Sequence, residues 1–163
     1  AATIADMNFV VLKSHDFEAG KNQVDKLKKR AREVGRKIQV WIHVYVVCRE
    51  TEKEARNYLN HYVVEKGDYV AVNNLMEIFG VQAESLPQEA LEQFRFHFIA
   101  GHGGYPLVGT PEQIVEGLEV LTKMGVDGCL ISWVNYKDEL SQWIDDVLPL
   151  MEQAGQRFSS NEQ

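Results

Sequence analysis

The alternation of strand-like and helical segments is the feature that most constrains the fold of this chain. Such alternation requires parallel strands joined by right-handed crossover connections. Three segments are predicted as strands, at residues 7–12, 38–48 and 126–133. A parallel sheet with only three strands leaves both of its edges open and encloses little core. The pattern therefore predicts an α/β chain that is a piece of a larger sheet or barrel.

Helix start and stop signals separate the strands. Thr51 followed by Glu54 forms a capping-box pattern, and Thr110 followed by Pro111 places a capping residue before a proline at the first helical position. Gly125 supplies a helix C-terminal signal. Helices are predicted over residues 17–34, 51–66, 69–79, 87–98 and 110–124, and from residue 136 onward.

One domain is expected over residues 1–155. Within it, the glycine-dense segment Gly101-His102-Gly103-Gly104-Tyr105-Pro106 predicts a loop over residues 99–110 that acts as a lid. Pro149 is expected to disturb or end the last helix, and residues 156–163 are expected to form a frayed tail.

The charge and apolar content of the chain exclude several classes of partner. The formal net charge is −7, and the chain has no long basic run, so neither nucleic acid nor an anionic membrane surface is expected as the main partner. No apolar stretch is long enough to span a membrane, and no signal-peptide pattern opens the chain. Cys48 and Cys129 lie in apolar strand-like runs and are expected to be buried free thiols in a reducing compartment, the cytoplasm.

Several motifs, in a fixed order, resemble the bacterial luciferase-like flavin monooxygenases. They are Ala5-Asp6-Met7-Asn8-Phe9; Val46-Val47-Cys48-Arg49-Glu50-Thr51-Glu52-Lys53-Glu54-Ala55; Gly103-Gly104-Tyr105-Pro106-Leu107-Val108-Gly109-Thr110-Pro111-Glu112-Gln113-Ile114; Gly125-Val126-Asp127-Gly128-Cys129-Leu130-Ile131-Ser132-Trp133; and Leu148-Pro149-Leu150-Met151. The resemblance covers nearly the whole chain. Within the family it is strongest to the dimethyl sulfone monooxygenase group.

The resemblance implies the C-terminal portion of a (β/α)₈ TIM barrel, about strands 6–8 with their helices. Such barrels need about 250 residues, so the first five strands, with the segment that holds the flavin phosphate in this family, are expected upstream of Ala1. The implied activity is that of a two-component monooxygenase, in which a separate reductase supplies reduced FMN and O₂ oxygenates a small organosulfur or related substrate. The fragment alone is expected to be inactive, and its expected partner is the N-terminal half of the barrel or a second copy.

Two alternatives to this function remain open. The chain could be a non-catalytic half-barrel that assembles through its open strand edges. It could also belong to a deazaflavin (F420)-dependent oxidoreductase that uses the same barrel.

His43 and Tyr45 are the catalytic candidates. Side chains alternate along a strand, so Trp41, His43 and Tyr45 share one face of the segment 38–48. In the related alkanesulfonate enzymes, the positions that match His43 and Tyr45 carry polar active-site residues of other types. A structural His–Tyr pair in the barrel floor is the alternative.

Cofactor contacts are predicted at Ser132, Trp133 and Asn8. An aromatic side chain after the last strand could pack on an isoalloxazine ring and exclude water, but a core tryptophan under the final helix is equally expected. Asn8 is a polar residue in a buried run, which indicates either a lined cavity or a satisfied structural amide.

The glycine-dense segment is interpreted as a lid, with substrate contacts at His102, Gly103, Gly104 and Tyr105. A phosphate site before the following helix is the weaker alternative. An oxyanion hole of the α/β-hydrolase type is excluded, because the sequence has no G-x-S-x-G motif. No metal site is predicted, because His97 and His102 have no evident third ligand.

Overall fold

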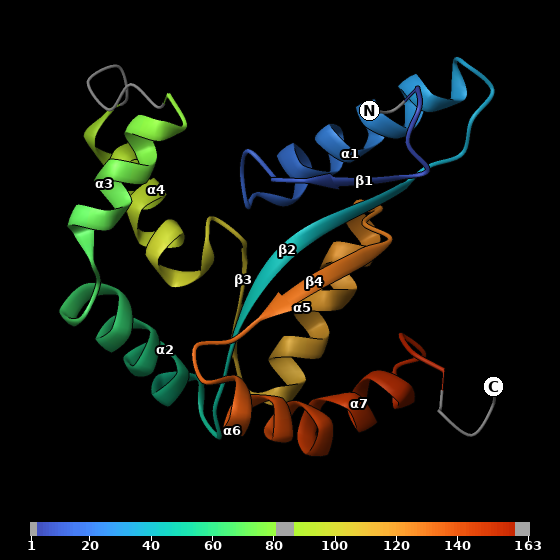
Figure 1. Cartoon of the computed structure of the whole chain (residues 1–163). Helices are drawn as coiled ribbons and strands as arrows, with labels where there is room; N and C mark the ends of the chain where they lie inside the picture. The colour runs from blue at the N-terminus through green and yellow to red at the C-terminus, as the bar shows by residue number, and fades with distance from the viewer. Residues whose placement is uncertain (1–2, 81–86, 159–163) are drawn as a thin grey trace.

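The computed structural model describes residues 3–80 and 87–158, and its core is a parallel sheet built around one long strand (Figure 1). That strand, β2 (Gln39–Cys48), pairs with β1 (Met7–Val10), β3 (Tyr105–Gly109) and β4 (Gly128–Ser132). β1 pairs with residues 39–42 and β3 with residues 44–48, while β4 pairs with residues 41–45. Because β4 overlaps both of the others, it occupies one edge of β2, and β1 and β3 follow one another along the opposite edge.

The α/β class and the parallel sheet are confirmed, but the expected number of strands is wrong. β3 occupies residues 105–109, which were predicted as part of a loop. Pro106 within it cannot donate a backbone hydrogen bond, a restriction that an edge strand tolerates. The expected loop 99–110 is thereby reduced to the few residues between helix α4 (Gln88–Gly101) and β3.

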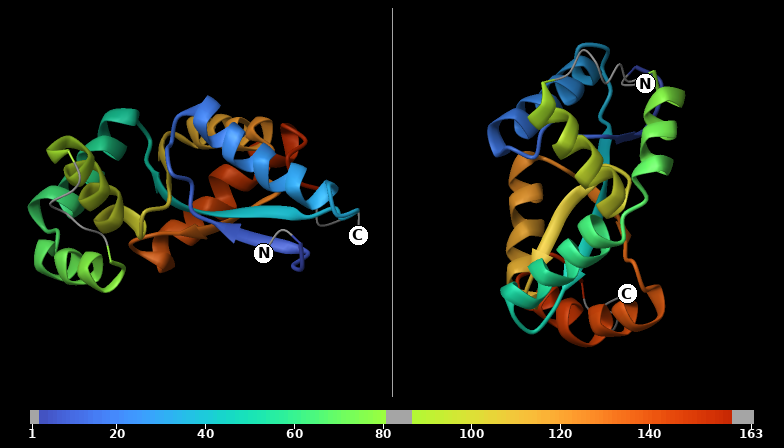
Figure 2. Two further views of the ribbon diagram at one scale, coloured as in Figure 1. Left: turned by 90° about the horizontal axis from the view of Figure 1, so that it is seen from above. Right: turned by 90° about the vertical axis from the view of Figure 1, so that its left-hand side faces the viewer.

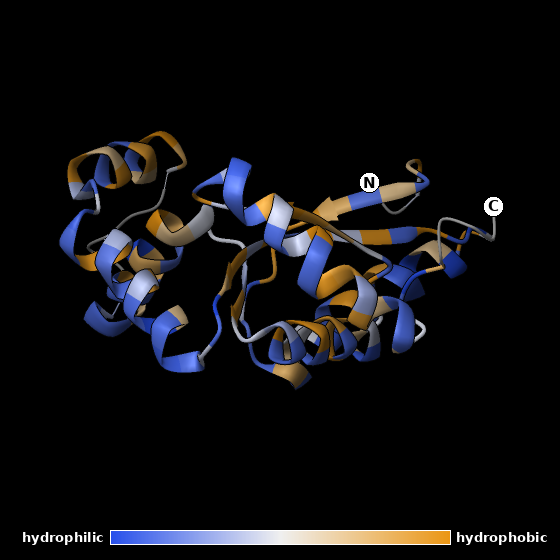
Figure 3. Cartoon of the chain, turned by 90° about the horizontal axis from the view of Figure 1, so that it is seen from below, coloured by the Kyte–Doolittle hydropathy of each residue, from blue (hydrophilic) through white to orange (hydrophobic). Residues whose placement is uncertain are grey.

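One face of the sheet is covered by helices that the sequence periodicity predicted. Helices α1 (Phe17–Arg32) and α5 (Pro111–Met124), with the π-helical turn η3 (Trp143–Val147), pack on this face. The shared core includes Val40, Ile42 and Val44 from β2 and Ile114 and Leu121 from α5. In Figure 3 the strands are mostly hydrophobic, while the helices mix hydrophobic and hydrophilic residues, as one-sided burial requires.

The other helices form a separate group. Helix α2 (Glu52–Asn60), the π-helical turn η1 (His61–Glu65), α3 (Tyr69–Ile78) and α4 stand together at the carboxyl end of β2, away from α1 and α5 (Figures 1 and 2). A smaller core joins α2, η1 and α4 to the sheet and contains Tyr45, Val47, Ala55, Val63 and Ala100, while α3 packs on α4. The helices divide between the two groups because β2 has two apolar faces, which alternate residue by residue.

The predicted capping boxes at Thr51 and Thr110 are confirmed, and Gly125 ends α5 in the left-handed conformation. Pro149 lies in the first turn of α7 (Leu148–Gln153), which follows η3 and α6 (Tyr136–Gln142), so it interrupts the regular helix without ending it. Most of the expected frayed tail lies outside the described residues. Gln156, within the described part of that tail, donates to the Val115 carbonyl at 3.0 Å.

The sheet face that carries His43 is open along much of its length. The strand register places Phe9 beside Trp41, and Leu130 beside His43, on this face. Phe9 is 54% exposed and Leu130 is 57% exposed. Large apolar side chains that face water on a sheet are expected where another part of a structure belongs.

Candidate functional site

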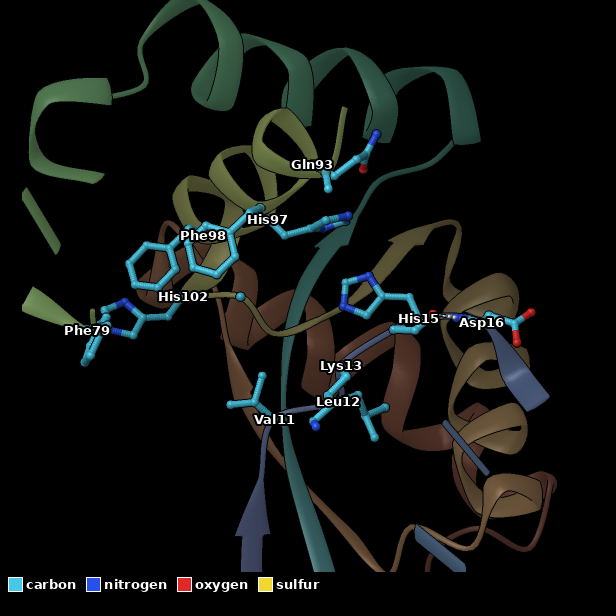
Figure 4. A pocket seen from close by; sticks show the side chains of 14 residues that line it. Val11, Leu12, Lys13, His15, Asp16, Phe79, Gln93, His97, Phe98 and His102 are labelled. Atoms are coloured by element: carbon cyan, nitrogen blue, oxygen red, sulfur yellow. Dashed lines mark hydrogen bonds between the residues drawn. The ribbon is translucent and has the colours of Figure 1, made fainter. Parts of the chain in front are cut away.

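A cavity of about 860 Å³ lies between the loop that follows β1 and the helix α4 (Figure 4). His97 and Phe98 reach it from α4, and His15 reaches it from the loop. The lining is mainly apolar and aromatic, with a few imidazoles, and consists of Val11, Leu12, Lys13, Ser14, His15, Asp16, Phe79, Ala90, Gln93, Phe94, His97, Phe98, His102 and Gly103. A large apolar cavity with a few converging polar groups is typical of a small-molecule site.

His43 and Ser132, both predicted site residues, are brought together. The His43 Nε2 atom lies 2.8 Å from the Ser132 hydroxyl oxygen. Burial, and secondarily the nearby His102, lowers the pKa of His43, because both disfavour the charged imidazole. A small crevice of about 10 Å³, lined in part by His43, shares His102 and Gly103 with the large cavity. His43 therefore lies next to the cavity as a neutral imidazole.

Tyr45 also lies at this end of the sheet, with a different partner. Its hydroxyl oxygen is 3.0 Å from Nδ1 of His97, which comes from α4. Tyr45 is 2% exposed, and burial raises the pKa of its phenol, so the hydroxyl keeps its proton and can donate it in this hydrogen bond.

His15 extends this contact to the loop after β1. Its ring meets the His97 ring edge to face, with ring centres 4.4 Å apart. Burial, and secondarily His97, lowers the pKa of His15 to about 4, and burial lowers the pKa of His97. Three elements distant in sequence thus present one buried phenol and two neutral imidazoles, and both imidazoles line the cavity.

The glycines of the predicted lid have a packing role. A Cβ atom on Gly101 would lie 2.4 Å from Cβ of Tyr45, and one on Gly104 would lie 2.8 Å from Nδ1 of His43. The segment must therefore be glycine at these points to pass over the two candidate catalytic side chains. His102 between them adopts the left-handed conformation, with φ 55°, and its ring packs on Phe98 at 4.8 Å between ring centres.

Of the remaining predicted residues, Tyr105 lines the small crevice together with His43, whereas Trp133 and Asn8 pack elsewhere. Trp133 packs against Tyr136 and Trp143, with ring centres 5.6 and 5.7 Å away, which supports its interpretation as a core tryptophan. Asn8 pairs in register with Val40, on the helix-covered face opposite His43. Its side-chain amide is buried and has no hydrogen-bond partner in the described structure. Tyr105 is half-buried in β3, and its ring lies 5.3 Å from that of His15.

Several lining residues were not predicted from the sequence. His15 comes from a turn. Phe94 and Phe98 come from α4, in which the sequence has weak hydrophobic periodicity. His97 was considered only as a metal ligand, and its partner Tyr45 lies 52 positions away. The sequence feature that could have indicated this site is the cluster of aromatic side chains that contains Phe94, Phe98 and His102.

Other kinds of site have no support in the described residues. Within residues 3–80 and 87–158, no three histidine, cysteine or acidic side chains come together as a metal site would require. No helix among those residues has the length and apolar character needed to cross a bilayer. Both cysteines are unpaired, and burial raises the pKa of each thiol to about 11.

Together, these features define an arc of parallel α/β structure with a cavity beyond the carboxyl end of β1, between the following loop and α4. Two solved structures share the fold. DmoA from Hyphomicrobium sulfonivorans matches 94% of this chain with a TM-score of 0.76 at 16% identity, and the match covers 38% of that chain. Long-chain alkane monooxygenase (LadA) also matches 94% of this chain, with a TM-score of 0.73 at 20% identity.

The sequence comparisons identify the family. The luciferase-like monooxygenase family model matches residues 1–128. An FMNH(2)-dependent dimethylsulfone monooxygenase of Pseudomonas putida is 30% identical over 162 residues, which is 96% of this chain and 44% of the relative. The chain therefore belongs to the luciferase-like monooxygenase family, and it spans less than half the length of this relative. The resemblance drawn from the motifs is confirmed.

Proposed function

We propose that this chain is the C-terminal half of a two-component monooxygenase that uses reduced FMN and O₂ to oxygenate a small organosulfur or related compound. Membership of the family and the dimethylsulfone relative support the reaction class. The observation that carries the proposal is the cavity beyond the carboxyl end of β1, with His43 and Tyr45 of β2 beside it, because parallel barrels build their active sites at the carboxyl ends of their strands.

The described residues offer little to the phosphate of a flavin. The cavity is within the size range of sites for drug-sized ligands. Among the lining residues, Lys13 is the one cationic side chain, and it is exposed. When bound, reduced flavin would supply the electrons for O₂ activation.

The chain's own contribution is to orient groups and to exclude water. His43, held by Ser132, can keep a proton at one ring nitrogen and accept one at the other. Tyr45, held by His97, offers a phenol that remains protonated. Phe94 and Phe98 shield the same space from solvent.

The proposal is tested in the complete enzyme, reconstituted from this chain and the proposed N-terminal half of the barrel. With reduced FMN, O₂ and dimethyl sulfone, His43→Ala is expected to lower turnover by about 10²-fold or more, as for other groups that hold a reacting proton. Far-UV circular dichroism should remain unchanged. Unchanged turnover would assign His43 to the scaffold, and a gene with no upstream α/β segment would overturn the proposal.

Residues 1–163 alone are expected to bind FMN weakly or not at all, because their cavity offers one exposed cation for the phosphate. Fluorescence quenching of FMN on titration with the chain measures this. Tight binding by a preparation shown to be pure by intact mass would contradict the half-barrel interpretation.

The exposed face of the sheet favours a second candidate function, that of a non-catalytic half-barrel that pairs with its own copy. Phe9 and Leu130 are half-exposed there, so a second copy could cover them. Sedimentation velocity distinguishes the two candidates. A stable dimer that Phe9→Ser disrupts would favour self-pairing, and a monomer that binds the upstream half would favour the enzyme.

A further inference from the structure

The composition of the large cavity specifies the chemical class of its ligand. We propose that the cavity between the loop after β1 and α4 takes an uncharged aromatic molecule, whose ring packs against phenylalanines and whose polar group meets the His15–His97 pair. The proposal deepens the proposed function by naming the substrate class, and it rests on that function only in treating the bound molecule as the substrate.

Aromatic rings line one side of the cavity as a continuous series. Phe94 and Phe98 are nearly parallel, with ring centres 5.5 Å apart and an interplanar angle of 19°. Phe98 also packs on Phe79 at 6.2 Å and on His102 at 4.8 Å between ring centres. A wall of rings favours a ligand that itself carries a ring, because offset and edge-to-face contacts add to simple apolar burial.

The volume of the cavity also points beyond a very small substrate. At about 860 Å³ it lies in the upper part of the range for drug-sized ligands. A molecule with only a few heavy atoms would leave most of this apolar wall unoccupied, so little surface would be removed from water.

The cavity lining contains two charged side chains, Lys13 and Asp16, and neither is available to bind a charged ligand among the rings. The Asp16 carboxylate caps α1 by accepting from the backbone N–H of Ala19 at 2.9 Å. Lys13 is exposed, and in Figure 4 its side chain extends away from the histidines. An anion bound among the rings would therefore lose its hydration without a buried counter-ion, which is costly.

The two imidazoles supply polar contacts without charge. The proximity of His15 to His97 and their burial keep both rings neutral near pH 7. Nδ1 of His97 is occupied by Tyr45, which leaves its other nitrogen for a ligand. A neutral imidazole can donate to a sulfone, sulfoxide or carbonyl oxygen.

Three probes separate charge from aromaticity. Methyl phenyl sulfone has a ring and no charge, benzenesulfonate has the same ring with a negative charge, and dimethyl sulfone has neither ring nor charge. Isothermal titration of residues 1–163, without flavin, is expected to show methyl phenyl sulfone binding at least about tenfold more tightly than either of the others. Equal or tighter binding of benzenesulfonate or of dimethyl sulfone, or no binding of any probe, would overturn the proposal.

A matched pair of variants locates the contact. Phe98→Leu keeps an apolar side chain but removes the ring, and it is expected to weaken methyl phenyl sulfone about tenfold while leaving dimethyl sulfone unchanged. Phe158→Leu is the control, because Phe158 is 78% exposed and lies outside the cavity lining. Unchanged binding by a folded Phe98→Leu variant would contradict the proposed placement, and if that variant does not fold, the three probes on the unaltered chain still decide.

These results are independent of the flavin reaction. If the aromatic probe does not bind but the reconstituted enzyme still turns over dimethyl sulfone, the proposed substrate class is wrong and the monooxygenase function stands. Binding of the aromatic probe without any reduced-FMN-dependent turnover would support the ligand class and contradict the monooxygenase function.

Discussion

The two groups of helices are attached to the same central strand in different ways. α1 and α5 cover one face of the sheet through a continuous apolar core, whereas α2, η1 and α4 attach to the carboxyl half of β2 through a smaller cluster around Tyr45. The first group depends on area buried from water, and the second depends on close contacts at a few points, including Gly101 against Tyr45. His43 and Tyr45 lie where the second group meets the sheet, on the strand whose alternate residues form the core of the first group.

The largest loss of stability is expected from a truncation in the core beneath α5. Ile114 is fully buried there, and Ile114→Ala removes apolar surface and leaves a cavity, so it should lower the free energy of unfolding by about 2–5 kcal/mol. Urea unfolding followed by circular dichroism measures the change. Ile78→Ala is the matched control in the second group, because Ile78 is 75% exposed and its loss should cost little. Equal losses in the two variants would contradict the distinction between the groups.

The next largest loss of stability is expected at an ion pair that connects α6 and α2 to the end of β2. Arg49 lies 2.9 Å from the Glu139 carboxylate of α6, and its guanidinium lies 3.9 Å from the centre of the Tyr58 ring of α2. Glu139 is 7% exposed, so Glu139→Gln leaves a partly buried cation without its counter-ion. Because the Arg49 side chain keeps some exposure, the loss should be about 2 kcal/mol rather than the full cost of a buried pair.

The exposed pair between Arg56 and Glu52 in α2 provides the comparison for that variant. Both side chains are largely in water, so Glu52→Gln should leave the free energy of unfolding nearly unchanged. If the two variants were equally stable, Arg49 would not be a connection between the groups.

Two glycines differ in how easily their neighbours could make room for an added methyl group: Gly101 at the site and Gly117 in the core. A Cβ on Gly101 would meet the backbone-proximal atoms of Tyr45 at 2.4 Å, whereas a Cβ on Gly117 in α5 would meet the flexible end of Leu107 at 2.6 Å. Gly101→Ala should therefore lower stability by about 1–3 kcal/mol and displace Tyr45 from His97, while Gly117→Ala should cost less than about 1 kcal/mol. The Tyr45 and His97 chemical shifts report the displacement, and a Gly101→Ala variant with native shifts would show that α4 can move away without consequence.

The same division explains what the sequence predicted well. The strand over residues 38–48 could be predicted because β-propensity determines it. The capping boxes at Thr51 and Thr110 could be predicted because local hydrogen bonds determine them. β3 was missed because Pro106 and the preceding glycines resemble a loop, and only pairing with β2 makes this segment a strand. The alternation along β2 correctly put His43 and Tyr45 on one face, but the partner His97 depends on a contact between distant segments. Asn8 was predicted as a cofactor contact, and the strand register places it on the face opposite His43.

The smallest effect concerns the pH dependence of the connection between the groups. The pKa of His15 is lowered from 6.5 to about 4 in the folded chain, first by burial and then by His97. The unfolded chain therefore binds a proton more readily, so the contribution of neutral His15 to stability is fully present above pH 6.5 and is lost as the pH falls from 6.5 toward 4. His15→Phe keeps a ring against His97 and removes the titrating group, so the free energy of unfolding should fall less steeply over this interval than in the unaltered chain. An unchanged slope, or an imidazole titration near pH 6.5 for His15 in the NMR spectrum, would show that the loop after β1 does not close on α4 and that the cavity is open on this side.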